Sequence, residues 1–271
     1  MTYLVAALLG VIQGLTEFLP VSSTAHLLIA GRLLGFEDPG DVFKVMIQLG
    51  SILAIMWIYR RKIVTVVSGL PSDADARRFA LVIVVASIPA LAAGALLSGY
   101  VKTVLYNNLF AIAAAFVVGG VVMLVVERVR PHPTILDAEH IPVSKAFGVG
   151  LCQMLALLPG VSRSGATIVG GMAMGIDRPA AAELSFFLAM PIMIAAFAHD
   201  LLEVKDLLSP ERGIEIAIGF VAAFVASALV VRPFLGFIRR AGFAPFAWYR
   251  IALGIALLGA YYLGWGLSPE A

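Results

Sequence analysis

The stretch GLTEFLPVSSTAHL, residues 14–27, places a carboxylate, a proline, several hydroxyls and a histidine inside a chain that is otherwise strongly apolar. Because proline stops a helix and serine or threonine caps the next one, this stretch predicts a helix break at residues 18–24. A second interruption, LLPGVSRSG at residues 157–165, has the same character. We therefore expect residues 3–35 and 145–175 each to form two half-helices around a polar break.

The composition is that of a membrane protein. The chain is 61% hydrophobic and only 13% charged, and its mean hydropathy is +0.98, far from the values of soluble domains. Its net charge of +2 gives no indication of a nucleic-acid partner. Six further stretches reach the ~20 apolar residues that a full crossing needs: residues 42–59, 79–98, 108–128, 181–202, 213–232 and 247–266. The sequence therefore predicts an all-α polytopic membrane protein with one membrane domain, 1–271.

The two breaks belong to a duplicated unit. When the chain is aligned with itself without a gap, in what we call the repeat alignment, identical residues coincide: Gly10 with Gly150, Gln13 with Gln153, Leu15 with Leu155, Val21 with Val161, Ser22 with Ser162, Gly31 with Gly171, and Gly35 with Gly175. The units span residues 1–135 and 141–271, and each holds a re-entrant half-helix pair followed by three full transmembrane helices. Since three is an odd number of crossings, the second unit is expected upside down, which makes an inverted-topology repeat.

Lysine and arginine in short loops predict the orientation of the chain, because these residues favour the cytoplasmic side. In the predicted topology one side carries ten basic residues: Arg60, Arg61, Lys62, Arg77, Arg78, Arg128, Arg130, Lys145, Arg239 and Arg240. The loops on the other side carry only Lys102, Lys205 and Arg212. That second side, which would hold both chain ends, is therefore expected to face the periplasm.

Non-helical backbone at membrane depth is tolerated only where protein or a wet cavity satisfies its polar groups. The two breaks should therefore meet in one polar pocket. The first break contributes Gln13, Glu17, Ser22, Ser23, Thr24 and His26. The second contributes Ser162, Arg163, Ser164 and Thr167.

These residue types indicate anion chemistry. Gln13 and Glu17 share a helix face, and His26 shares one with the serines before it. A carboxylate, a hydroxyl and an imidazole can thus converge. Arg163 stands among hydroxyls at the start of a half-helix, whose N–H groups and positive dipole end favour an anion. Phosphate fits this site best, because arginine binds phosphate oxygens in a planar bidentate arrangement.

Structural explanations also exist for these residues. Serine and threonine in membrane helices often bond the backbone, and Glu17 with Arg163 could form an ion pair that only locks the repeats together. His26 alone would be a packing residue. The clustering of these groups favours function. For His199 and Asp200, near the end of a predicted span, exposure at the membrane interface is the simpler interpretation.

The two motifs resemble a known family. The spacing of Gln13 and Glu17, running into PVSSTAH (residues 20–26), together with PGVSRSGAT (159–167), resembles the undecaprenyl-diphosphate phosphatase family of the bacitracin-resistance type. The resemblance extends over essentially the whole chain. It implies a multi-pass enzyme of the bacterial inner membrane that removes the terminal phosphate of undecaprenyl diphosphate for peptidoglycan synthesis. The family pattern allows Glu or Gln at the first motif position, so Gln13 leaves Glu17 as the carboxylate.

The resemblance also implies a divalent cation, Mg²⁺. In our hypothesis Glu17 either contacts this ion or activates the attacking group. In our mechanistic hypothesis Arg163, Ser162 and Thr167 hold the diphosphate of the polyprenyl lipid, and Ser23 or His26 is the nucleophile or proton carrier. The remaining binding residues are Gln13, Ser22, Thr24 and Ser164. The sequence does not decide between Ser23 and His26.

Two questions stay open at this level. Inverted repeats with broken helices are typical of secondary transporters, so a carrier or flippase for a polyprenyl phosphate or another anion is the alternative function. A carrier has less need of a carboxylate, a hydroxyl and an imidazole beside its anion site. The small-residue runs GALLSG (94–99) and AIAAAFVVGG (111–120) predict either close helix packing or a groove for the lipid tail.

Overall fold

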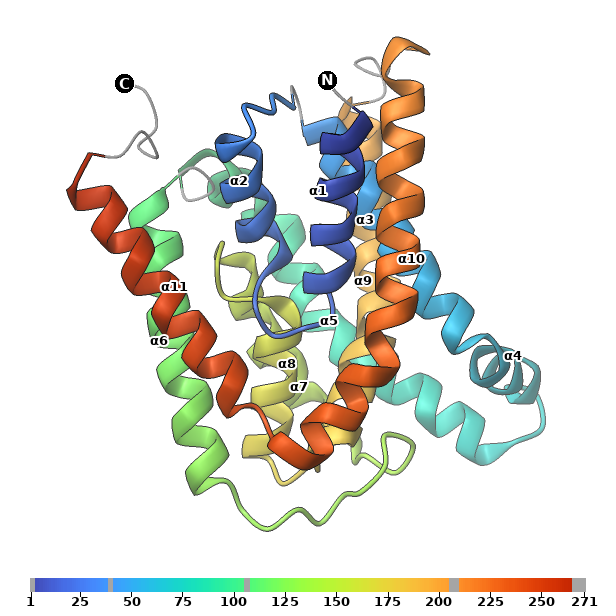
Figure 1. Ribbon diagram of the computed structural model, residues 1–271. Helices are drawn as coiled ribbons and strands as arrows, with labels where there is room; N and C mark the ends of the chain where they lie inside the picture. The colour runs from blue at the N-terminus through green and yellow to red at the C-terminus, as the bar shows by residue number, and fades with distance from the viewer. Residues whose placement is uncertain (1–2, 39–40, 105–107, 205–209, 265–271) are drawn as a thin grey trace.

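A computed structural model describes residues 3–38, 41–104, 108–204 and 210–264 of the chain. These residues are mainly helical (Figure 1), and within them the only extended pairing is an isolated bridge between Ile135 and Ile176. The all-α prediction is confirmed. The helices are α1 (Tyr3–Thr16), α2 (Ser23–Leu33), α3 (Val42–Ile58), α4 (Arg60–Gly69), α5 (Ala74–Val104), α6 (Leu109–Val129), α7 (Val143–Met154), α8 (Arg163–Ala173), α9 (Arg178–Val204), α10 (Pro210–Ala241) and α11 (Ala244–Tyr262).

The long helices coincide with the predicted crossings. Within the described residues five helices, α5, α6, α9, α10 and α11, are long and apolar enough to span a membrane. The pair α3 and α4 makes a sixth candidate, bent by 70° at the junction between the two helices. The chain is therefore a multi-pass membrane protein.

One local expectation was wrong. Arg60, Arg61 and Lys62 were placed in a loop after the first full span, but they begin α4, and Arg77 and Arg78 lie in α5. The segment RRKIVTVVSG contains only its final glycine as a helix breaker, so the chain turns at Tyr59 and resumes a helix at once. The basic residues are thus on helices that flank a short turn.

Both predicted interruptions are present. The chain leaves α1 at Thr16 and enters α2 at Ser23; it leaves α7 at Met154, passes through a 3₁₀ turn (Leu155–Leu157) and enters α8 at Arg163. Each pair of half-helices forms a hairpin. In Figure 1 the first hairpin opens toward the end of the molecule that carries both termini, and the second opens toward the opposite end, where the connection 130–142 runs.

The backbone follows the repeat alignment as the sequence does. Ser22 and Ser162 both adopt a positive φ, 67° and 75°, which is unusual for residues other than glycine. Gly35 and Gly175 follow their half-helices with φ of 59° and 81°. Helix α1 packs on α10 as α7 packs on α5, and the repeat alignment relates these two pairs. This pairing supports the inverted repeat of units 1–135 and 141–271, whose inverted relation remains a prediction.

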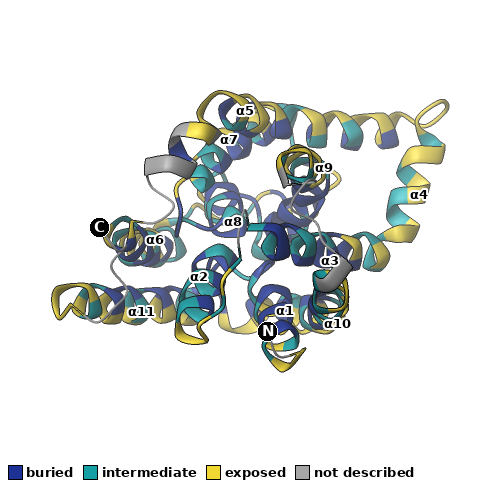
Figure 2. Cartoon of the chain, turned by 90° about the horizontal axis from the view of Figure 1, so that it is seen from above, coloured by how far each residue is buried: buried dark blue, intermediate teal, exposed yellow. Residues whose placement is uncertain are grey.

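Small residues let the half-helices approach the long ones closely. A Cβ atom on Gly10 in α1 would lie 2.2 Å from the carbonyl oxygen of Gly219 in α10, and one on Gly150 in α7 would lie 2.4 Å from that of Ala86 in α5. Seen from above, α8 lies near the centre of the molecule with longer helices around it (Figure 2). The first half-helix of each hairpin is therefore packed closely against a long helix, and α8 is surrounded by other helices.

The outer faces of the long helices are apolar. Large side chains exposed on α5, α6 and α10 recur at helical spacing: Leu81, Val84, Ile88, Val118, Val121, Val125, Val221, Val225 and Leu229. Such faces are expected to contact lipid. Of the residues used to predict the orientation, Lys205 lies outside the described residues, and the side chain of Lys102 is not described. Helices α6 and α10, whose last turns carry basic residues, both end opposite the termini (Figure 1).

Candidate active site

Glu17 is the meeting point of the two breaks. Its Oε2 atom accepts hydrogen bonds from Gln13 Nε2 at 3.0 Å and from Ser23 Oγ at 2.5 Å. Its Oε1 atom accepts one from Arg163 Nη2 at 3.3 Å. The structure thus brings together the carboxylate and hydroxyl of one half with the guanidinium of the other. A second donor of Arg163, Nη1, bonds the carbonyl oxygen of Ser185 in α9 at 3.0 Å and fixes the side chain from behind.

Ser162 and Ser164 shape the start of α8. Ser162 is the N-cap of this helix, and its Oγ atom accepts from the backbone N–H of Gly165 at 3.2 Å. The Oγ atoms of Ser162 and Ser164 lie 3.1 Å apart, and Ser164 donates to the carbonyl oxygen of Leu19 in the first break at 2.7 Å. These hydroxyls therefore join the two breaks directly.

Thr167 is held within the protein. Its Oγ1 atom lies 2.7 Å from Ser185 Oγ and within hydrogen-bond distance of the carbonyl oxygens of Arg163 and Ser164. Ser185 also accepts from Arg163 through its own carbonyl oxygen. Thr167 and Ser185 thus tie α8 to α9 directly behind the arginine.

A residue that the sequence analysis did not consider organises both breaks. Arg250 in α11 is 1% exposed, and its guanidinium donates to four carbonyl oxygens. The acceptors are Pro20 at 3.1 Å, Gly160 at 2.9 Å, Val161 at 2.9 Å and Ala115 at 3.0 Å. Three of them lie in the breaks, where the backbone has no helical partner. An arginine inside the predicted span 247–266 was the sequence pattern that could have revealed this, because charged residues within spans are rarely without a role.

A cavity of about 200 Å³ opens beside Glu17 and Arg163. Six of the ten predicted site residues line it: Glu17, Ser22, Ser23, Thr24, Ser162 and Arg163. Gln48 of α3 and Gln153 of α7 add two amides to the lining. The other four predicted residues, Gln13, His26, Ser164 and Thr167, are not part of it. Polar groups from both halves therefore face one small space.

His26 has its own set of partners. Its Nδ1 atom lies 2.8 Å from the carbonyl oxygen of Ser22, and its Nε2 atom lies 2.5 Å from the hydroxyl of Tyr249 in α11. The imidazole stacks on the Tyr249 ring and also contacts Phe116 of α6. In this arrangement Ser23, and not His26, presents its polar atom beside Glu17.

An apolar groove continues from the cavity. A second hollow of about 370 Å³ lies between α5 and α9 and shares Ala90, Ala156, Leu157, Ile192 and Ala196 with the cavity. Gly94 and Ala95, from the run GALLSG, line it. The run 111–120 instead packs against α11, since a Cβ on Gly120 would lie 2.7 Å from the carbonyl oxygen of Ala247. The two small-residue runs thus serve different purposes.

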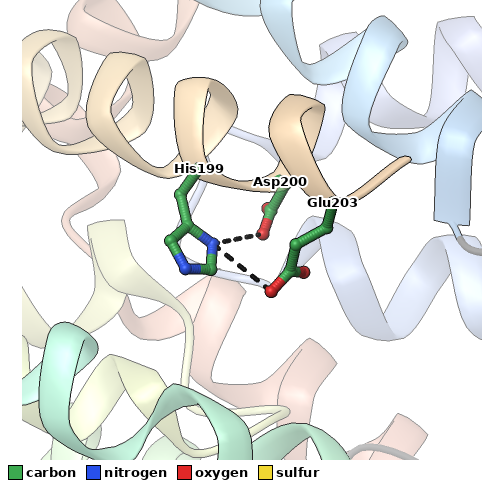
Figure 3. Close-up of side chains that lie close together, drawn as sticks. All are labelled: His199, Asp200 and Glu203. Atoms are coloured by element: carbon green, nitrogen blue, oxygen red, sulfur yellow. Dashed lines mark ion pairs between the residues drawn. The ribbon is translucent and has the colours of Figure 1, made fainter. Parts of the chain in front are cut away.

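At the far end of this groove lies a cluster on the last turns of α9 (Figure 3). His199 Nδ1 is 3.5 Å from Asp200 Oδ1 and 3.8 Å from Glu203 Oε1. His199 is exposed, as expected at a span end, while Asp200 is half-buried. The ligand atoms lie close enough to hold an ion, but exposed acidic groups commonly cluster without one, and none of these residues lines the cavity at Glu17.

Comparisons with known proteins give one consistent result. The family model described as "Bacitracin resistance protein BacA" matches residues 6–256. The chain is 50% identical to the undecaprenyl-diphosphatase of Cereibacter sphaeroides, over 97% of this chain and 98% of that protein. It is 52% identical to undecaprenyl-diphosphatase 1 of Agrobacterium fabrum, over 92% and 93%, and 47% identical to the undecaprenyl-diphosphatase of Paracoccus denitrificans, over 97% and 98%.

Proposed function

The chain belongs to the bacitracin resistance protein BacA family, and we propose that it hydrolyses undecaprenyl diphosphate to undecaprenyl phosphate and inorganic phosphate. The product is the lipid carrier that peptidoglycan synthesis reuses. The observation that carries the proposal is the contact of Glu17 with both Ser23 and Arg163 at the wall of a cavity. This arrangement offers a base, a nucleophile and a cation to a diphosphate.

In the proposed first step, Ser23 Oγ attacks the terminal phosphorus and gives its proton to Glu17. The bond from phosphorus to the bridging oxygen breaks, and undecaprenyl phosphate leaves. Water then attacks the phosphorus of the phosphoserine, and the bond from phosphorus to Ser23 Oγ breaks. One proton of the water goes to Ser23 Oγ, hydrogen phosphate leaves with the other, and Glu17 releases its proton to solvent. The distance of 2.5 Å from Ser23 Oγ to Glu17 Oε2 supports this assignment of the base.

Arg163 is proposed to bind the oxygens of the transferred phosphoryl group, where negative charge is concentrated. To do so, Arg163 must give up part of its contact with Glu17 in favour of the substrate. The contact from Arg163 Nη2 to Glu17 Oε1 is long, at 3.3 Å, and lies at the cavity wall, so this exchange is feasible. Ser162 and the N–H groups at the start of α8 face the same anion. Gln13, Ser164 and Thr167 are proposed to support these groups from outside the cavity.

His26 is proposed as a positioning residue that holds the first break through the carbonyl oxygen of Ser22 and the hydroxyl of Tyr249. Single Ser23→Ala and His26→Ala variants decide between the two nucleophiles. The proposal expects a trapped phosphoserine in the wild type and in His26→Ala, and none in Ser23→Ala. Activity that survives the loss of Ser23 would eliminate the serine nucleophile.

We propose a divalent cation, Mg²⁺, as cofactor. Glu17 is the only carboxylate that lines the cavity among the described residues, which fits an ion that binds through one carboxylate and the substrate's phosphate oxygens. Such an ion would neutralise charge on the diphosphate. A chelator should then abolish phosphate release, and Mg²⁺ should restore it. Loss of this Mg²⁺-dependent recovery in His199→Ala would point to the α9 cluster instead.

The polyprenyl tail is proposed to lie in the apolar groove between α5 and α9, which joins the cavity. Helix α9 runs toward the end of the molecule that carries both termini (Figure 1), and the positive-inside pattern predicts that this end faces the periplasm. We therefore propose a protein of the bacterial inner membrane whose site opens to the periplasm.

Phosphate release from undecaprenyl diphosphate by the purified protein in detergent tests the function, because transport is impossible there. The proposal expects release that Arg163→Ala removes without loss of folding. The carrier alternative is not favoured, since the related proteins are named as diphosphatases and a carboxylate and hydroxyls line the cavity beside the arginine. Absence of release with every lipid diphosphate would reverse that preference.

A further inference from the structure

Gln153 is a buried amide without a partner. It lies in the last turns of α7 and is 2% exposed. Neither its Oε1 nor its Nε2 atom forms a hydrogen bond with any described part of the chain. A buried amide that loses its water and gains no other partner is destabilising, so native proteins rarely retain one without a reason.

The position of Gln153 indicates what the missing partner is. Gln153 lines the same cavity as Glu17, Ser23 and Arg163. A group that enters this cavity is therefore the partner that the amide can reach. The amide offers two N–H donors and one carbonyl acceptor, and phosphate oxygens accept such donors well.

Gln13 corresponds to Gln153 in the first half, but its amide does have a hydrogen-bond partner. Gln13 donates to Glu17 at 3.0 Å and lies outside the cavity lining. In the repeat alignment, Glu17 corresponds to Leu157, whose side chain cannot accept a hydrogen bond. The second half thus keeps the glutamine but lacks the carboxylate that would accept its hydrogen bond.

We propose that Gln153 is a substrate-binding residue whose Nε2 atom donates to an oxygen of the diphosphate group. Its Oε1 atom accepts a hydrogen bond from a water molecule that hydrates the bound diphosphate. This inference rests on the proposed hydrolysis of a lipid diphosphate and adds a ligand that the two motifs do not contain. The substrate is thereby held between Arg163 on α8 and an uncharged donor on α7.

The test replaces the amide by an apolar side chain of similar length, Gln153→Met. Removing two unpartnered polar atoms should leave the thermal unfolding temperature unchanged or raise it. Loss of a substrate hydrogen bond should raise KM for the lipid diphosphate about tenfold, and should weaken competition by inorganic diphosphate by a similar factor. A structural residue would give the opposite pattern, in which stability and activity fall together.

Ser51→Ala is the matched control. The Ser51 hydroxyl in α3 is also buried and unpartnered within the described residues, but Ser51 does not line the cavity. Its replacement should keep or raise stability and leave KM unchanged. Gln153→Glu provides a second variant, because a carboxylate at this place repels the diphosphate and should raise KM further than Gln153→Met.

Two outcomes would overturn the proposal. One is an unchanged KM and unchanged competition by inorganic diphosphate in Gln153→Met, which would mean that the amide binds only a structural water. The other is a fall in unfolding temperature that accounts for the loss of activity. If the wild type releases no phosphate at all, the proposed function fails, whereas calorimetric binding of inorganic diphosphate to wild type and Gln153→Met still tests Gln153.

Discussion

The two breaks have the same backbone and opposite chemistry. Ser22 and Ser162 begin their half-helices with similar positive φ angles, and a bond or cap at each joins the break to the helix that follows. After the break all five positions of 23–27 differ from 163–167 in the repeat alignment, and the polar changes include Ser23 to Arg163, Thr24 to Ser164 and His26 to Ala166. Before the break, Glu17 corresponds to Leu157.

This difference shows how two breaks of similar backbone can form one site. Hydrolysis of a diphosphate needs a base and a nucleophile. It also needs a cation that stabilises the negative charge of the phosphate oxygens, because a carboxylate base repels that charge. In the proposed reaction the first break supplies the base and the nucleophile, and the second supplies the cation. Since the two loops face each other, each half can specialise without the insertion of a new element.

Removing the cation should have the largest effect. Arg163→Ala deletes the charge that is proposed to stabilise the transferred phosphoryl group and leaves Glu17 without its ion pair. We expect phosphate release to fall about 10³-fold, the effect of losing a transition-state arginine. Phosphate release at saturating lipid diphosphate measures this effect. Arg163→Lys should retain part of the activity, because it keeps the charge but not the bidentate geometry.

A double variant distinguishes the two interpretations of the ion pair. If Glu17 and Arg163 only lock the halves together, Glu17→Gln with Arg163→Met should be stable, and each single variant should unfold more readily than the pair. If they act in the reaction, restored stability in the double variant will not restore phosphate release. Activity above a tenth of the wild-type value in folded Arg163→Ala would contradict the catalytic role.

Arg250 donates hydrogen bonds to both breaks. Its replacement should therefore have the next largest effect, which is a loss of stability. Arg250→Met leaves the carbonyl oxygens of Pro20, Gly160 and Val161 without their donor. Hydrogen bonds to a charged group contribute about 1.5–3 kcal/mol each, and partial relaxation reduces the sum, so we expect a loss of about 3 kcal/mol. Thermal unfolding in detergent measures it. An unchanged unfolding temperature would mean that the breaks hold their shape without Arg250.

Much of the fold could be predicted because it depends on local patterns. Apolar stretches of full membrane length gave the long helices, and proline, glycine and serine gave both interruptions. The contact between Glu17 and Arg163 followed from the duplication, since two unsatisfied breaks in a membrane must face each other. These inferences need only residue types and spacing.

The rest depended on contacts between residues far apart in sequence. Arg250 is 230 positions from Pro20, and Tyr249 is 223 from His26. Apart from the arginine itself, no local pattern indicates which face of α11 turns toward the breaks. The sequence grouped His26 with Ser23 by helix spacing, but α11 supplies the partner that holds the imidazole away from the cavity lining. Gln153 was recognised only as a repeat identity, because its lack of a partner appears only in three dimensions.

Tyr249→Phe sharpens the distinction between Ser23 and His26 in the first break. The variant keeps the ring stacked on His26 and removes only the hydroxyl that lies 2.5 Å from Nε2. If His26 is a positioning residue, we expect kcat to fall by less than about tenfold, roughly the effect of one hydrogen bond, with an unchanged pH profile. A shifted pH profile of kcat would instead indicate that the imidazole transfers a proton in the reaction.

The smallest expected effect is a difference in unfolding temperature between glycine variants of the two serines at positive φ. Ser22→Gly relieves backbone strain worth about 1 kcal/mol and removes no cap, because Ser22 makes no side-chain capping bond. Ser162→Gly relieves the same strain but loses the hydroxyl that accepts from Gly165, so gain and loss should nearly cancel. The unfolding temperature should therefore rise for Ser22→Gly and stay nearly constant for Ser162→Gly. Ser22→Ala, which keeps the strained Cβ, serves as the control and should give no gain. An equal rise in both glycine variants would mean that the Ser162 cap does not stabilise α8, and that the second break differs from the first in its side-chain chemistry alone.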